Sequence, residues 1–156
     1  MTDAAAVLEL ARRKGWKIVT AESCTGGLIS AALTDIPGSS DVVDRGFVTY
    51  SNDAKVAMLG ILPQTLVNHG AVSEEIAREM AVGALIRSKA NVSVAVTGIA
   101  GPGGSEFKPE GRVCFGVATV DQCRTETVEF GAIGRRMVRA ATVEHALNLL
   151  ANALQS

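Results

Sequence analysis

A chain of 156 residues in which 47% of the side chains are hydrophobic and 20% are charged can bury the substantial core of one domain. Fifteen basic and sixteen acidic side chains leave a net charge of -1, which argues against nucleic acid or an anionic membrane as a partner. The apolar runs are shorter than the roughly 20 residues of a membrane span, and residues 1–6 lack the basic flank of a signal peptide. We therefore expect one cytoplasmic domain over residues 1–156, and its apolar helices are compatible with a homodimer.

The spacing of apolar residues predicts helices that alternate with strands. In chain order we expect a helix over residues 3–14, a strand over 17–20, a helix over 26–34, a strand over 45–49, helices over 52–59 and 74–89, a strand over 91–97, a hairpin of strands over 111–120 and 125–130, and a helix over 136–154. Gly15 and Gly60 end two of these helices, and Ser51 and Ser73 cap the starts of two. The order predicts a three-layer α/β/α sandwich with a mixed, mostly parallel sheet.

Residues 20–27, Thr-Ala-Glu-Ser-Cys-Thr-Gly-Gly, join a predicted strand to a predicted helix. Ser23 therefore lies near a helix N-terminus, where unpaired backbone N–H groups can hold a developing oxyanion or a phosphate. A turn in which Ser23 and Thr25 merely cap the helix explains the same pattern. Cys24 is a rival nucleophile, because thiolates are more reactive and a helix N-terminus lowers the pKa of a thiol, although no histidine partner is evident.

Residues 49–55, Thr-Tyr-Ser-Asn-Asp-Ala-Lys, place the Tyr50 phenol just before a helix and the Lys55 amine near its first turn. A cation is disfavoured there, so we expect the pKa of Lys55 to be depressed and the neutral amine to be available as a base. A solvated surface lysine is the alternative. The only histidines are His69, in a predicted turn, and His145, and neither is near a G-x-S-x-G motif, so an amine is the expected base for a serine nucleophile.

Two further segments carry groups that suit an anion. Residues 97–104, Thr-Gly-Ile-Ala-Gly-Pro-Gly-Gly, let the backbone approach a ligand, although their spacing matches neither a Walker loop nor a dinucleotide fingerprint. Residues 134–139, Gly-Arg-Arg-Met-Val-Arg, put Arg135 and Arg139 on one helix face, where they could clamp a phosphate or carboxylate. A plain flexible loop and a solvated helix face are the alternatives. No His, Asp or Glu cluster has metal-ligand spacing, and we expect neither a metal nor a cofactor.

A series of ordered motifs runs through most of the chain: Ala-Glu-Ser-Cys-Thr-Gly-Gly at 21–27, Pro-Gly-Ser-Ser at 37–40, Arg-Gly-Phe-Val-Thr-Tyr-Ser-Asn at 45–52 with Lys55, Gly-Ala-Val-Ser at 70–73, and Thr-Gly-Ile-Ala-Gly-Pro at 97–102 followed by Lys108 and Pro109. In these motifs the chain resembles the C-terminal domain family of the competence-damage-inducible protein CinA, whose stand-alone members are nicotinamide mononucleotide amidohydrolases. Longer members carry an additional N-terminal nucleotide-processing domain. That second activity is not expected, because the chain begins at the amidase-like domain.

The resemblance implies metal-independent hydrolysis of nicotinamide mononucleotide to nicotinate mononucleotide and ammonia, a step of pyridine-nucleotide salvage. It implies that Ser23 attacks the amide carbon, that Lys55 takes its proton and that Tyr50 orients or relays that proton. Backbone N–H groups near residues 24–27 would stabilise the oxyanion. The alternative is a non-catalytic nucleotide-binding module linked to competence or the DNA-damage response, in which the same residues bind a nucleotide without chemistry.

The substrate-binding residues expected from the resemblance are Cys24, Thr25, Gly26, Gly27, Arg45, Thr97, Gly98, Gly101, Arg135 and Arg139. The phosphate would meet the glycine-rich loop, Thr97, Arg45 and either Arg135 or Arg139. The family's spacing after the last strand is one residue shorter than here, so Arg135 and Arg136 could exchange roles.

Overall fold

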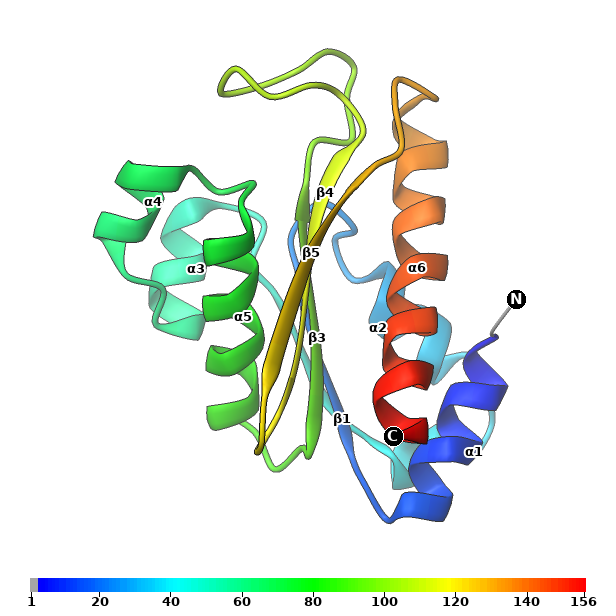
Figure 1. The fold of residues 1–156 in the computed structure, drawn as a ribbon. Coiled ribbons are helices and arrows are strands. Elements are labelled where there is room, and N and C mark those ends of the chain that lie inside the picture. Colours follow the sequence, from blue (N-terminus) through cyan, green and yellow to red (C-terminus); the bar gives the residue numbers. More distant parts are fainter. Residues whose placement is uncertain (1–2) are drawn as a thin grey trace.

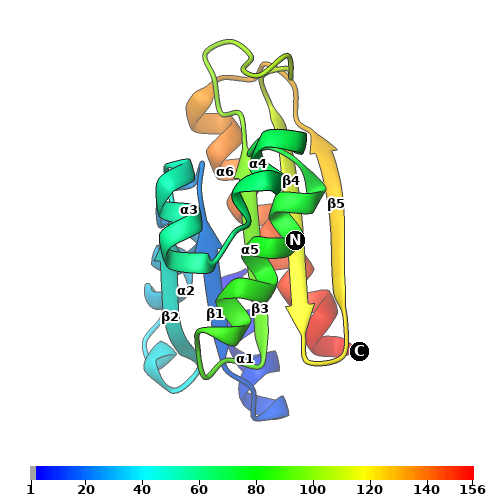
Figure 2. The same ribbon diagram turned by 90° about the vertical axis from the view of Figure 1, so that its left-hand side faces the viewer.

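A computed structural model describes residues 3–156 and shows three layers around one sheet (Figure 1). The sheet has the strand order β2-β1-β3-β4-β5 and consists of β1 (Ile18–Glu22), β2 (Val43–Val48), β3 (Val92–Gly98), β4 (Arg112–Thr119) and β5 (Cys123–Glu129). One face is covered by α1 (Ala4–Lys14), α2 (Leu28–Thr34) and α6 (Arg135–Gln155). The other face, turned to the viewer in Figure 2, is covered by α3 (Asn52–Leu59), α4 (Pro63–His69) and α5 (Glu74–Ile86). A short 3-10 helix, η1 (Ser39–Asp41), precedes β2.

The three-layer architecture is confirmed, but the sheet is evenly mixed rather than mostly parallel. Strand β1 pairs in parallel with β2 and β3, whereas β4 pairs antiparallel with both β3 and β5. A parallel return from β3 would need a crossover element, and the connection over residues 99–111 contains no helix. Because β1, β2 and β3 run in one direction, their carboxyl ends meet at the same edge of the sheet.

Two apolar clusters hold the layers together. Strand β3 is buried along almost its whole length, as expected for a strand covered on both faces. Val94 and Val96 belong to the cluster beneath α1 and α6, and Ala95 belongs to the cluster beneath α5, which includes Ile76 and Met80. The alternation along one strand thus commits each side chain to one layer.

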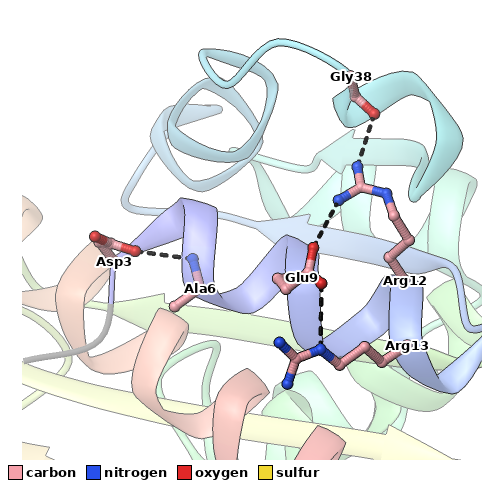
Figure 3. Close-up of polar contacts among 6 residues, drawn as sticks. All are labelled: Asp3, Ala6, Glu9, Arg12, Arg13 and Gly38. Atoms are coloured by element: carbon pink, nitrogen blue, oxygen red, sulfur yellow. Dashed lines mark hydrogen bonds and ion pairs between the residues drawn. The ribbon is translucent and has the colours of Figure 1, made fainter.

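Helix α1 is fixed at both ends by polar contacts, which Figure 3 shows. Asp3 caps the helix by accepting a hydrogen bond from the N–H of Ala6 at 2.8 Å. Further along, Arg12 contacts the Glu9 carboxylate at 3.3 Å and donates to the carbonyl oxygen of Gly38 at 3.2 Å. The helix is therefore tied to the loop that leads into β2, and its start agrees with the prediction.

Helix α4 was missed, because the sequence predicted only a turn around His69. None of the residues of this seven-residue helix is buried, so it has no apolar stripe for periodicity to detect. Pro63 at its start and Gly70 at its end are the signals that could have found it. None of the helices within residues 3–156 is long and apolar enough to cross a membrane.

Candidate active site

Ser23 and Lys55 meet at the carboxyl edge of the sheet. Ser23 directly follows β1, and Lys55 lies early in α3, which follows β2. The Nζ atom of Lys55 is 3.0 Å from the Oγ atom of Ser23 and 3.0 Å from the carbonyl oxygen of Thr49. Lys55 is 1% exposed and Ser23 8% exposed, so Lys55 is not a solvated surface residue. A neutral amine here can donate to Thr49 and accept the hydroxyl hydrogen of Ser23.

The burial of Lys55 favours this neutral form. Desolvation lowers the pKa of the Lys55 amine from its ordinary value, and a negative charge on Cys24 or Glu106 acts in the opposite direction when that group is ionised. Within residues 3–156 the amine forms no ion pair that would hold it protonated. The direction is the one expected from the sequence, but the dominant cause is removal from water rather than the helix N-terminus. This direction favours an amine that acts as a base beside the serine hydroxyl.

Cys24 occupies a different environment from its neighbour. Its side chain is buried in the apolar cluster that lies beneath α1 and α6. Burial raises the pKa of the Cys24 thiol to about 11, which is the opposite of the effect expected from a helix N-terminus. The thiol is therefore protonated at neutral pH, and only the thiolate is a strong nucleophile. This favours Ser23 over Cys24 as the attacking group.

Glu22, to which the sequence interpretation gave no role, organises the turn after β1. Its carboxylate is completely buried and accepts four hydrogen bonds. The donors are the hydroxyl of Thr25 at 2.6 Å and the backbone N–H groups of Gly27 at 3.2 Å, Ile29 at 2.9 Å and Ser30 at 2.9 Å. The amides at the start of α2 are thus occupied from within the protein. The signal that could have found it is an acidic residue just before a predicted helix start.

The backbone N–H groups of this turn differ in whether another residue accepts their hydrogen bond. The N–H of Ser23 donates to β3, and the N–H of Gly26 donates to the carbonyl oxygen of Ser23 at 3.0 Å. Across residues 3–156, the N–H groups of Cys24 and Thr25 have no acceptor in another residue. Both residues follow Ser23 directly in the chain, and Cys24 lines the cavity at Ser23, so their N–H groups are candidate donors to an oxyanion. Gly26 contributes a left-handed backbone (φ 59°) rather than a donor.

Arg139, on α6, contacts this turn rather than the cavity. Its Nε donates to the carbonyl oxygen of Cys24 at 3.1 Å, and its Nη2 donates to that of Thr25 at 3.2 Å. Arg139 is not among the residues lining the cavity at Ser23. The sequence grouped it with the phosphate ligands, but its guanidinium supports the backbone of the turn.

Arg135, one helical turn earlier on α6, reaches the rim of the site. It donates to the hydroxyl oxygen of Tyr50 at 2.6 Å and to the carbonyl oxygen of Gly101 at 2.7 Å. Tyr50 is 58% exposed, and its hydroxyl is held by Arg135 rather than by Ser23 or Lys55. Arg136 lines neither of the cavities described next, which favours Arg135 in the alternative left open by the sequence.

Two adjoining cavities form the candidate site. A cavity of about 190 Å³ lies over Ser23 and Lys55 and is bounded by Tyr50 and Thr97. A second, of about 280 Å³, lies over the glycine-rich loop and shares Val72, Gly98, Ala100 and Arg135 with the first. Together they give the site a reactive end at Ser23 and Lys55 and a second end lined by the glycine-rich loop, Glu106 and Arg135. Asn52, Ala71 and Val72 line it without having been predicted.

Contacts with the Glu110 side chain shape the glycine-rich loop. Gly101 has φ 90°, and a Cβ atom there would lie 2.5 Å from the carboxyl carbon of Glu110. The same carboxylate accepts a hydrogen bond from the N–H of Gly103 at 2.5 Å. Thr97 donates its hydroxyl to the carbonyl oxygen of Ala71, so it forms a wall of the cavity. The contacts with Glu110 fix the backbone of the loop at Gly101 and Gly103.

Arg45 does not reach the site. Its guanidinium contacts the Asp44 carboxylate at 2.7 Å and the carbonyl oxygen of Arg87 at 3.1 Å. Arg45 pairs with Val19, and Ser23 lies four residues further along that strand direction, or roughly 13 Å away at the usual strand rise. The expectation that Arg45 binds the phosphate therefore has no support in the geometry. Residues 3–156 also contain no group of three His, Cys, Asp or Glu side chains placed to hold a metal.

Comparison with known proteins places this geometry in a family. The protein-family model described as CinA C-terminal domain matches residues 2–154 of this chain. A nicotinamide-nucleotide amidohydrolase PncC from Enterobacter agglomerans is 58% identical over 111 residues, which cover 70% of this chain and 68% of that protein. A CinA-like protein from Chlorobium phaeobacteroides is 49% identical over 149 residues, 92% of this chain but 36% of that protein. The chain spans about a third of the length of the first curated relatives it matches.

Solved structures show the same likeness. The crystal structure of competence/damage inducible protein CihA from Agrobacterium tumefaciens has 52% sequence identity and a TM-score of 0.88, covering 97% of this chain and 96% of that one. A CinA superfamily protein from Klebsiella pneumoniae has 35% identity and a TM-score of 0.93, covering 97% and 95%. Sequence and fold agree over almost the whole length. The chain belongs to the CinA C-terminal domain family.

Proposed function

We propose that this protein hydrolyses the carboxamide of nicotinamide mononucleotide to nicotinate mononucleotide and ammonia, a salvage step in the cytoplasm. The observation that carries the proposal is the buried Ser23 hydroxyl 3.0 Å from the amine of Lys55. A serine beside an unprotonated amine suits attack on an amide carbonyl. The substrate class is supported by the similarity to the protein named nicotinamide-nucleotide amidohydrolase.

The first half of the reaction forms an ester. The Ser23 oxygen attacks the carboxamide carbon while Lys55 takes the hydroxyl proton. The oxyanion that develops accepts hydrogen bonds from the N–H groups of Cys24 and Thr25. Lys55 then passes its proton to the amide nitrogen, the C–N bond breaks and ammonia leaves.

The second half returns the enzyme to its starting state. A water molecule enters the position that ammonia left, and Lys55 takes one of its protons as it attacks the ester carbon. The same two N–H groups stabilise the second oxyanion. The Ser23 oxygen leaves with the proton from Lys55, and nicotinate mononucleotide is released. Tyr50 stands at the rim, where its hydroxyl orients the proton transfer to the leaving nitrogen.

The two cavities suit the two ends of this substrate. The pyridine ring enters the cavity at Ser23, which directs the ribose and phosphate to the cavity over residues 98–104. There the backbone amides of the loop and the guanidinium of Arg135 meet the phosphate. Arg135 would exchange its hydrogen bond to Tyr50 or Gly101 for the phosphate oxygens. Thr97 lines the cavity at Ser23, and Gly98 lines both cavities.

The test is chromatography of nicotinamide mononucleotide after incubation with purified protein and no added metal, beside the Ser23→Ala variant. We expect nicotinate mononucleotide and ammonia in equal amounts from the unmodified protein, and at least about a 10³-fold lower rate from the variant. If both folded proteins bind the nucleotide and neither forms product, the proposal fails. The chain would then be a non-catalytic nucleotide-binding module.

A further inference from the structure

Glu22 is adjacent to the proposed nucleophile, but none of the steps above uses it. It is 0% exposed, and within residues 3–156 it forms no ion pair. Burying a carboxylate is costly unless hydrogen bonds replace its water. The four donors of the turn and of α2 supply those bonds, so the position is built around this carboxylate.

The bonds to Glu22 span the turn that carries Ser23. One oxygen, Oε1, accepts from Thr25, Gly27 and Ile29, and the other, Oε2, accepts from Ser30. Glu22 itself ends β1, where its backbone pairs with β2 and β3. A single side chain therefore connects the end of the strand to the start of the helix, with the reactive segment between them.

The turn is also held by Arg139, whose charge is opposite to that of the Glu22 carboxylate. Arg139 binds the carbonyl oxygen of Cys24, and the N–H of Gly26 binds that of Ser23. In a trans peptide the C=O and the N–H of one unit point in opposite directions. Fixing those two carbonyls therefore fixes the directions of the N–H groups of Thr25 and Cys24, which are the two candidate oxyanion donors.

We propose that Glu22 is a positioning residue for the reaction at Ser23, which holds the turn so that the serine oxygen and the two candidate oxyanion donors face the same point. This inference rests on the proposed function. Glu22 does not touch the substrate, and it acts by drawing the hydroxyl of Thr25 and the amides of α2 inward. Without the carboxylate, those amides would compete for the oxyanion and the turn would lose its inner anchor.

The test compares Glu22→Gln with Ser93→Ala as a matched control. Ser93 is also a fully buried polar side chain that joins a strand to a helix, since it donates to the carbonyl oxygen of Ala81 at 2.7 Å. It lies roughly 10 Å along β3 from the level of Glu22. The readouts are kcat and KM for nicotinamide mononucleotide, the rate at which a fluorophosphonate probe labels Ser23, and the urea midpoint.

For Glu22→Gln we expect kcat and the labelling rate to fall by about 10- to 100-fold while KM stays within about twofold, because a displacement of about 1 Å can cost 100-fold. Ser93→Ala should keep both rates whatever its loss in midpoint. If Glu22→Gln fails to fold, Thr25→Val replaces it, because it removes one donor to the carboxylate and keeps the side-chain shape. For Thr25→Val we expect kcat and the labelling rate to fall by at least about threefold, because the turn loses one of its bonds to Glu22 and the catalytic groups shift.

The inference is overturned if folded Glu22→Gln, or Thr25→Val in its place, keeps the rates of the unmodified protein or changes KM alone. It is also overturned if Ser93→Ala loses as much rate at the same midpoint. A protein that is labelled at Ser23 but does not convert nicotinamide mononucleotide contradicts the proposed function, and the labelling rates still decide the role of Glu22. Absence of labelling and turnover in the unmodified protein contradicts both.

Discussion

At the scale of single residues, the properties of the site follow from which groups are buried and which hydrogen bonds they retain. Lys55 and Cys24 are both removed from water, so the amine tends to lose its proton and the thiol to keep its own. Ser23 is then the group that the amine can activate. The serine and the lysine were identifiable from their motifs, but the pKa of the thiol depends on packing against α6 and could not be predicted from its place in the turn.

The lowered pKa of Lys55 has a measurable effect on stability. Between the folded and the unfolded pKa of Lys55, the lysine amine is protonated in the unfolded chain but not in the folded protein. The free energy of unfolding should therefore rise with pH over this range. The slope is at most about 1.4 kcal/mol per pH unit. Below the folded pKa the penalty is constant, and above the unfolded pKa it is absent.

Urea denaturation of the unmodified protein and of Lys55→Met at several pH values between 7 and the unfolded pKa of 10.5 measures this effect. Other groups titrate in both proteins, so the difference between the two unfolding free energies isolates the lysine. We expect that difference to change in favour of the unmodified protein as the pH rises. A difference that is flat over this range would show that Lys55 keeps its ordinary pKa.

At the scale of elements, α6 gives two arginines of one face different tasks. Arg135 borders both cavities, whereas Arg139 holds the carbonyl groups of the nucleophile turn. Arg135→Met should therefore raise KM for nicotinamide mononucleotide by about tenfold or more, as loss of a charged hydrogen bond does. Arg139→Met should mainly lower kcat. Steady-state kinetics separates the two, and equal changes in KM for both variants would contradict the assignment.

The packing of α5 on α3 makes another prediction at this scale. A Cβ atom added at Gly83 would overlap the carbonyl oxygen of Leu59, which is backbone and cannot rotate away. Gly83→Ala should therefore destabilise the protein by about 1–3 kcal/mol, although the same change in an open helix stabilises by about 1 kcal/mol. Thermal denaturation beside Val82→Ala, at the exposed neighbouring position, measures it. A rise in melting temperature for Gly83→Ala would show that α3 and α5 are packed less closely.

The elements that the sequence predicted well are those with a periodic apolar pattern. The buried strand β3 and the helix α5 are examples, since each commits its apolar side chains to a defined layer. Helix α4 lacks such a pattern. The antiparallel pairing of β3 with β4 depends on the path of a long loop, which the local spacing of apolar residues does not predict. The expectation for Arg45 came from the family motif rather than from its position, since the strand predicted over residues 45–49 begins at Arg45, far from the edge where Ser23 lies.

At the scale of the whole molecule, the sheet brings together residues that are distant along the chain. Parallel strands place Ser23 and Lys55 at one edge, and the return of β4 leaves the glycine-rich loop over the same edge. The start of α6 completes the rim with Arg135. The site therefore needs the correct topology of four segments, which explains why motifs alone identified its members without their arrangement.

The central claim is that Ser23 forms an ester with the substrate, and mass spectrometry of the protein quenched in acid during the first turnover tests it most directly. Nicotinamide mononucleotide should add its acyl group to the peptide that contains Ser23, and the adduct should be absent from Ser23→Ala, which forms no product. An adduct on Cys24, or product from Ser23→Ala at the rate of the unmodified protein, would contradict the account.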